Sequence, residues 1–276
     1  MAADAPQTQT ATSQDIEANK GQLEKHQPSA IAQRFRETLD TNHADLVFIV
    51  CSLITGLSDG SAYNAWSCFI SMQTGNTIFL GLGASGQPFT KPYGWLKSLV
   101  SIASFFCGAF TFSHATRWAG PRLRGTLFAS FLIQCIFIMI AAGLIEGDLI
   151  PHTINDMSLT SGPLFLELIP LFILAFQFGG QMAASRAMGF NEIPTVVLTS
   201  VYFDIATDPA LTAPPTRNVK RNRRIGSVTG ILVGAIAAGW LSRSSGGMES
   251  ALWIGGGLKF CIAMSWLFWK PVAEKK

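Results

Sequence analysis

The sequence contains few charged residues. Lys, Arg, Asp and Glu make up 13% of its 276 residues, whereas a soluble domain usually has about 25%. The deficit is concentrated in several windows of about 18 or more residues that carry at most one charge, close to the length that crosses the hydrocarbon of a bilayer as a helix. This composition excludes a soluble globular domain and predicts an all-α, polytopic membrane protein.

The motifs of enzymes and metal sites are also missing. The chain has no HExxH, GxSxG or P-loop pattern and no aspartate pair in an intramembrane protease setting. Its five cysteines lie in apolar segments without CxxC spacing, which predicts small buried hydrophobes rather than a disulfide frame or a zinc site. We therefore expect no enzyme activity, no metal and no cofactor. Nucleic acid is not an expected partner either, because no basic folded domain is present.

The first 43 residues are polar and contain no long apolar run. They do not resemble a secretory signal peptide, and the start, Met-Ala-Ala, lacks the glycine of a myristoylation site. We predict a disordered polar tail over residues 1–43, with a short amphipathic stretch near 31–39. Residues 44–272 are predicted to form a single transmembrane domain.

Six apolar segments are long enough to cross a bilayer and two are shorter. The long ones cover residues 46–66, 98–116, 125–145, 163–185, 225–242 and 251–269. Of the short ones, 67–85 is interrupted in its middle by Gln73-Thr74-Gly75-Asn76, and 193–203 is too short to span as a regular helix. The chain thus has either eight spans, or six spans and two re-entrant or broken half-helices.

The distribution of basic residues favours six spans. Lys and Arg near span ends prefer the cytoplasmic side, and six spans with a cytoplasmic amino terminus place more of the 20 basic residues there than eight spans do. We therefore predict six spans, two half-helices and both termini in the cytoplasm. The sequence does not show which membrane the protein occupies.

The two halves of the chain are weakly similar. Gly56-Leu57-Ser58-Asp59, followed by Thr74, aligns with Phe178-Gly179-Gly180-Gln181, followed by Thr199. With three spans in each half, the second copy enters the membrane from the opposite side. This predicts an inverted repeat of residues 44–146 and 163–272, an arrangement in which secondary transporters build a midplane site from broken helices.

The same stretches carry a family resemblance. Residues 56–83 resemble the first signature of the YoaK-type transmembrane proteins (domain of unknown function 1275), with matches at Asp59, Thr74, Gly75 and Asn76. The second signature is matched more loosely around Gln181, Thr195 and Thr199, with Met182 where Asn is usual and Ser200 where Gly is usual. The resemblance covers about residues 45–270. It implies a membrane protein and supplies neither a reaction nor a substrate.

Asp59 is the strongest candidate for a functional residue. A carboxylate near the centre of a spanning helix costs about 2.5–3.5 kcal/mol, so it is expected to face a cavity or a partner. It either binds a cation or carries a proton, or it caps the re-entrant segment by accepting backbone hydrogen bonds. Thr74-Gly75-Asn76 likewise either coordinates a solute or only ends a half-helix.

The second half contributes further candidates. Gln177 and Gln181 lie four residues apart on one helical face, where they either join helices or line a path. Asn191, Pro194 and Thr195 are predicted to break the chain and to begin the second half-helix. The hypothetical substrate site consists of Asp59, Thr74, Gly75, Asn76, Gln181, Thr195 and Thr199, meeting near the midplane.

Three other features have structural interpretations. Lys259 is either a counter-ion of Asp59 or Glu167, or extends to the membrane surface, which is the preferred interpretation. The stripe of Gly226, Gly230 and Gly234 predicts close helix packing, within the chain or in a homo-oligomer. A basic juxtamembrane loop is predicted to attract anionic lipid at about 1 kcal/mol per charge; its basic residues are Arg217, Lys220, Arg221, Arg223 and Arg224.

Two functions are consistent with these features. The first is a secondary transporter or permease for a small solute or ion, with Asp59 favouring a cation or proton coupling over an anion. The second is a non-transporting membrane scaffold or assembly factor in which the polar turns are purely structural.

Overall fold

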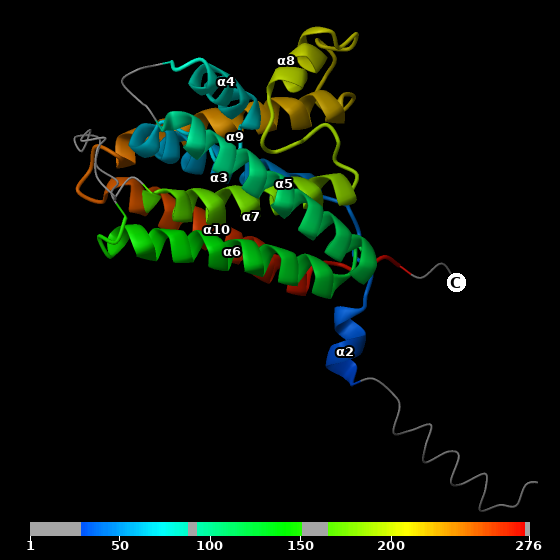
Figure 1. Cartoon of the computed structure of the whole chain (residues 1–276). Helices are drawn as coiled ribbons and strands as arrows, with labels where there is room; N and C mark the ends of the chain where they lie inside the picture. The colour runs from blue at the N-terminus through cyan, green and yellow to red at the C-terminus, as the bar shows by residue number, and fades with distance from the viewer. Residues whose placement is uncertain (1–28, 88–92, 151–164, 274–276) are drawn as a thin grey trace, which may run out of the picture.

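The computed structural model describes residues 29–87, 93–150 and 165–273. In this part of the chain the fold is entirely helical. The helices are α2 (Ala30–Phe35), α3 (Ala44–Trp66), α4 (Gln73–Ala84), α5 (Gly94–Ala119), α6 (Arg124–Glu146), α7 (Leu168–Ala187), α8 (Thr199–Ala206), α9 (Val219–Leu241) and α10 (Gly247–Phe268). Figure 1 shows the long helices side by side in a bundle, with α2 and the carboxyl terminus at the same end.

Six of these helices are long and apolar enough to cross a membrane: α3, α5, α6, α7, α9 and α10. Helices α4 and α8 have 12 and 8 residues, which is about 18 and 12 Å of helix and too short to span. The prediction of a polytopic all-α protein with six spans and two short helices is confirmed in the described residues.

The break before α4 lies earlier than predicted. Helix α3 ends because Ser67 adopts a left-handed conformation, with φ of 54°. The chain is irregular from there to Met72, and Gln73–Asn76 forms the first turn of α4 rather than an interruption. The prediction failed because Gly and Asn suggest a turn. Here the Asn76 side chain instead bonds to the backbone of Phe69, seven residues earlier in the chain.

The second short helix is also shifted. The apolar run 193–203 was predicted to form it, but α8 begins only at Thr199. Ile193 and Val196 instead belong to an irregular segment, and their side chains are buried in the core. Thr195 in the same segment has a positive φ of 64°. The predicted break at Pro194 and Thr195 is therefore correct, and the helix starts four residues after it.

Two pairs of spans pack with their backbones almost in contact. Helix α3 packs against α9, and α5 packs against α7. A Cβ atom at Gly56 would overlap the carbonyl of Ile231, and one at Gly179 would overlap the carbonyl of Phe105. Glycine allows this close approach, which is a main source of helix association in membranes. The predicted stripe on α9 thus packs inside the same chain, with Gly234 against the backbone of α3.

The packing of the six spans is similar when the two halves are exchanged. The pair α3–α9 then corresponds to α7–α5, and α3–α10 corresponds to α7–α6. Two ion pairs correspond as well: Lys97 of α5 pairs with Glu167 before α7, and Arg223 of α9 pairs with Asp45 in the first turn of α3. This equivalence supports the predicted inverted repeat.

The correspondence also fixes the register of the two halves. Gly56 contacts α9 as Gly179 contacts α5, so the structure matches Gly56 with Gly179. The alignment made from the sequence matched Gly56 with Phe178 and was therefore shifted by one residue. As a result, Asp59 corresponds to Met182, and the second half has no carboxylate at the equivalent place.

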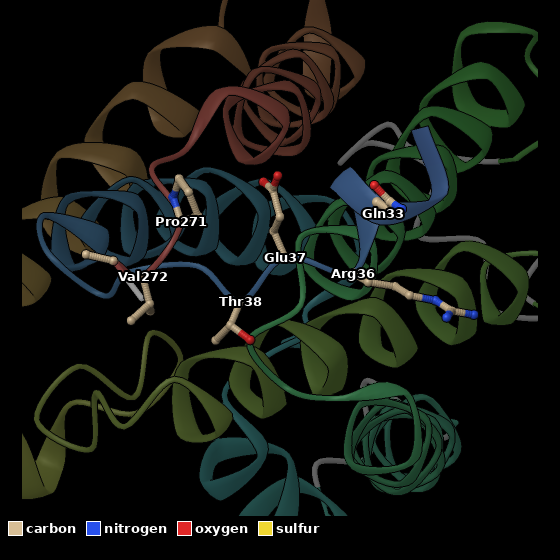
Figure 2. Close-up of a pocket in the computed structure, with 7 residues that line it drawn as sticks. Gln33, Arg36, Glu37, Thr38, Pro271 and Val272 are labelled. Carbon is tan, nitrogen blue, oxygen red and sulfur yellow. The ribbon is translucent and has the colours of Figure 1, made fainter. Parts of the chain in front are cut away.

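The amino-terminal segment is structured from residue 29 onward. Its backbone pairs with both neighbours, through bridges Thr38–Leu123 and Leu39–Pro271. Figure 2 shows Glu37 and Thr38 beside Pro271 and Val272, around a surface pocket of about 570 Å³. The prediction of a disordered tail up to residue 43 is wrong for residues 29–43, because paired backbone holds them. Residues 1–28 lie outside the described part of the chain.

A buried arginine holds this segment in place. The Arg124 side chain is only 3% exposed. It donates to the carboxylate of Glu37 and to the carbonyls of Trp266 and Leu267 at the end of α10. It therefore neutralises one acid and satisfies carbonyls that the end of a helix leaves open.

Glycine substitutions test the close packing. Gly56→Ala and Gly179→Ala should each lower the free energy of unfolding by about 1–3 kcal/mol, because the added methyl group forces the paired helices apart. Gly239→Ala is the matched control, since nothing lies within 4 Å of its Cβ position. Thermal unfolding in detergent measures both. An equal loss in the control would contradict the assignment of these contacts.

Candidate functional site

Asp59 holds the irregular segment between α3 and α4. Its carboxylate accepts hydrogen bonds from the backbone N–H of Ile70 at 2.8 Å and of Ser71 at 2.9 Å, and from the Ser71 hydroxyl at 2.5 Å. Asp59 lies seven residues before the end of α3, which is about 10 Å along the helix. The segment therefore turns back about 10 Å into the bundle, and α4 is a re-entrant half-helix.

Asn76 connects the re-entrant segment to α5. Its Oδ1 accepts from the N–H of Phe69 at 3.1 Å, and its Nδ2 donates to the Phe69 carbonyl at 2.7 Å and to the Ser101 hydroxyl at 3.0 Å. Gly75 lies against the aromatic ring of Phe69, because a Cβ atom at Gly75 would come within 2.9 Å of that ring. The Thr74 side chain is exposed. Three of the four predicted residues of this half thus build one structure, and Thr74 stands outside it.

The predicted residues of the second half lie apart from this structure. Gln181 is fully buried and donates from Nε2 to the Thr55 hydroxyl at 2.8 Å, which joins α7 to α3. Thr195 is buried in the segment before α8, whereas Thr199 is exposed at the start of α8. The second half therefore contributes three separated positions.

The two half-helices do not meet. In Figure 1, α4 and α8 lie on the same side of the bundle, and their carboxyl ends point toward opposite ends of it. No contact joins α4 to α8 in the described residues. The prediction that the candidate residues converge where the half-helices meet is therefore corrected: α4 packs on α5 and α8 packs on α9.

Gln177 was noted in the sequence but left out of the predicted site. Its side chain is fully buried, and neither its amide nitrogen nor its oxygen has a hydrogen-bond partner in the described residues. Gly179 faces α5 and Gln181 faces α3. At 3.6 residues per turn, Gln177 lies about 40° around α7 from Gln181 and about 160° from Gly179, so it shares the helical face of Gln181.

The re-entrant segment links α3 to α5. The backbones of these two helices are not packed together, and Lys97 of α5 reaches only the Trp66 carbonyl at the end of α3, at 3.5 Å. The segment bonds to Asp59 on α3 and, through the Phe69 carbonyl, to Ser101 on α5 at 2.8 Å. We call Asp59, Ser71, Asn76 and Ser101 the re-entrant site. Ser101 was missed, although Ser98, Ser101 and Ser104 follow helical spacing in an apolar span.

Other buried polar atoms lack partners as well. In the described residues these include the hydroxyls of Ser58, Ser61, Ser104 and Thr195, and the amide oxygen of Gln181. Each buried polar group without a partner costs about 1–3 kcal/mol, and lipid cannot supply one. The interior therefore has hydrogen-bonding capacity that the described residues do not use.

Lys259 lies away from both predicted counter-ions. It is fully buried in α10 and donates to the amide oxygen of Gln134. Glu167 pairs with Lys97 instead, and Asp59 binds the re-entrant segment. The preferred interpretation, that Lys259 extends to the membrane surface, is wrong, because its ammonium group points into the bundle.

Most of the predicted lipid-binding basic residues are engaged within the protein. Arg221 is buried and donates to backbone carbonyls of the preceding loop. Arg223 pairs with Asp45 and Glu192, and Arg224 pairs with Asp204 and Asp208. All three belong to the first turns of α9, which corrects the prediction of a free basic loop. Arg217 and Lys220 are exposed.

Acidic groups at the two ends of the bundle differ in their environment. Burial raises the pKa of Glu167, and the nearby Lys97 opposes this shift. The hydrogen bond from Asn218 lowers the pKa of Asp208. No group of three or more metal-ligating side chains occurs in the described ranges.

Comparison with known proteins identifies a family. A family model described as "Protein of unknown function (DUF1275)" matches residues 47–265. No curated protein and no solved structure matches the chain.

The anchoring role of Asp59 can be tested by substitution. Asp59→Ala should lower the free energy of unfolding by about 3 kcal/mol, because two backbone N–H groups lose their acceptor in a buried place. Asp59→Asn keeps one acceptor oxygen and should lose about 1 kcal/mol. Thermal unfolding measures both, with the exposed Thr74→Ala as a neutral control. Full stability of Asp59→Ala would contradict the anchor.

The ion pair at Glu167 should respond to pH. Because its pKa is raised in the folded state, Glu167 takes up a proton above the ordinary value of 4.5. The stability of the wild type relative to Glu167→Gln should therefore increase as pH falls through the range just above 4.5. Melting temperatures between pH 7 and 3 measure this. Asp208→Asn should show the opposite sign, because the lowered pKa of Asp208 stabilises the fold at neutral pH; that contribution is lost only below about 3.8.

Proposed function

We propose that this chain, which belongs to the DUF1275 family of proteins of unknown function, is a permease for a small neutral polar solute. One observation carries the proposal: the carboxamide of Gln177 is fully buried and has no partner among the described residues. A carboxamide offers two donors and one acceptor oxygen. It is thus suited to a solute that both donates and accepts hydrogen bonds.

The hydrogen bonds of Asp59 argue against a cation as the solute. Its oxygens already accept three hydrogen bonds from Ile70 and Ser71. A cation would have to compete with these donors and would release the segment that holds α4. The expectation that Asp59 favours a cation or a proton therefore loses its basis. The polar groups that remain free, such as Gln177 and Ser104, are uncharged.

Ion pairs close the bundle at both ends, which suits a solute path that opens to one side at a time. Lys97 and Glu167 pair where α5 and α7 begin, and Arg223 pairs with Asp45 and Glu192 where α9 and α3 begin. In a six-span bundle these two places lie at opposite membrane faces. Two related halves with a lock at each face suit alternating access, in which one half moves against the other.

The basic residues suggest the orientation. The end that carries both described termini also carries Arg117, Arg122, Arg186 and Arg217. Basic residues near span ends favour the cytoplasm. We therefore place this end, with both termini, on the cytoplasmic side.

A non-transporting scaffold or assembly factor is the second candidate. Asp59 and Asn76 both make hydrogen bonds that a purely structural role explains. Arg217 and Lys220 remain exposed for a partner or for anionic lipid.

Solute flux distinguishes the two functions. Purified protein in liposomes should speed the entry of small amides or polyols beyond that into protein-free liposomes. Gln177→Leu should reduce this flux roughly tenfold, because about 1–2 kcal/mol of hydrogen bonding is lost, while stability stays equal or rises. Light scattering after osmotic shock measures the flux. Ile169→Leu, on the exposed face of α7, is the matched control. Wild-type flux no faster than the protein-free background favours the scaffold.

A further inference from the structure

Lys259 occupies an unusual place for a basic residue. It is 0% exposed and lies twelve residues after the start of α10 and nine before its end, which is about 18 and 14 Å from the two helix ends. Both distances exceed the length of its side chain. Its ammonium group is therefore held in the middle of the bundle.

The ammonium group has fewer partners than donors. It carries three N–H donors, and one acceptor is identified, the amide oxygen of Gln134. The ring of Phe131 lies 5.0 Å from the nitrogen and adds a cation–π contact. An ammonium ion with such incomplete pairing is costly to bury.

No carboxylate balances this charge in the described residues. The ionisable groups that act on Lys259 are the thiols of Cys51 on α3 and Cys135 on α6. The carboxylates of Asp59 and Glu167 are engaged elsewhere. The surroundings of Lys259 thus hold a positive charge without its counter-charge.

A buried donor without a partner lies on α3, beside the turn of α10 that precedes Lys259. The Ser58 hydroxyl is buried and lacks a hydrogen-bond partner. It lies 3.8 Å from the Cβ position of Gly255, four residues before Lys259 on α10. A Cβ atom at Gly255 would meet Ile54 at 3.5 Å and Ser58 at 3.8 Å, which are ordinary contact distances, so the absent side chain leaves room for a group of about the size of a methyl.

We propose that Lys259 and Ser58 form a binding site for a small monovalent anion between α3, α6 and α10. The anion accepts hydrogen bonds from the ammonium group and the hydroxyl, and it supplies the missing negative charge. Gln134 positions the ammonium group from α6. The anion is a halide or the carboxylate group of a solute. This site is separate from the re-entrant site and does not depend on the proposed transport of a neutral solute.

Anion-dependent stability of the purified full chain tests the site. The protein in detergent is placed in sodium gluconate, whose anion is too large for the site. Chloride or formate then replaces gluconate at constant ionic strength. The melting temperature of the wild type should rise by a few degrees and saturate, because the anion binds only the folded state. The chloride and formate series distinguish a halide from a carboxylate.

Three variants assign the effect to Lys259. Lys259→Met should lose the rise and melt no lower than the wild type in gluconate, because an unpaired charge is gone. Lys270→Met, which removes an exposed charge at the end of α10, should keep the rise. Gln134→Leu should show a larger rise, because the ammonium group loses the one acceptor that the described residues provide. It serves as the test if Lys259→Met does not fold.

Two results would overturn the proposal. One is a wild type whose melting temperature does not depend on chloride or formate, which indicates a neutral amine without a bound anion. The other is a rise in Lys259→Met equal to that of the wild type. Anion binding that persists in Gln177→Leu, a variant expected to lose flux, separates this site from the proposed transport.

Discussion

Lipid cannot accept or donate hydrogen bonds, and this constraint shapes the interior of the protein. A backbone segment that leaves the helical conformation inside the bundle needs a partner for each of its polar groups. The carboxylate of Asp59 and the carboxamide of Asn76 provide these partners for the segment before α4. Without them the chain could not turn back between α3 and α5.

Glycine determines how closely the spans approach. In each half, a pair of helices packs with backbone against backbone, at Gly56 and Gly234 in one pair and at Gly108 and Gly179 in the other. The hydrophobic effect does not hold such helices together in lipid, so dispersion contacts at short range must do so. The same contacts relate the two halves, because each pair joins the first span of one half to the second span of the other.

Much of the fold was predictable from the sequence, and the parts that failed share one cause. Long apolar runs directly gave the six spans, because the bilayer imposes their length. The sequence pattern could not show which polar groups form hydrogen bonds with each other. The Asn76 side chain makes a helix start of a sequence that resembles a loop. Arg124 orders a polar segment that was predicted to be disordered. Lys259 remains buried, and the amide oxygen of Gln134 accepts a hydrogen bond from its ammonium group. These pairings join residues that are far apart along the chain, except at Asn76.

The backbone pairing of residues 37–40 breaks the equivalence of the two halves. This segment bonds to Arg122 and Arg124 in the first half and to Lys270 and Val272 in the second. It therefore acts as a strap across both halves at one end of the bundle, and no counterpart at the opposite end occurs in the described residues. Rocking of the halves would pivot at the strapped end and open widest at the other. The two nearly equivalent halves would thus open unequally at the two membrane faces.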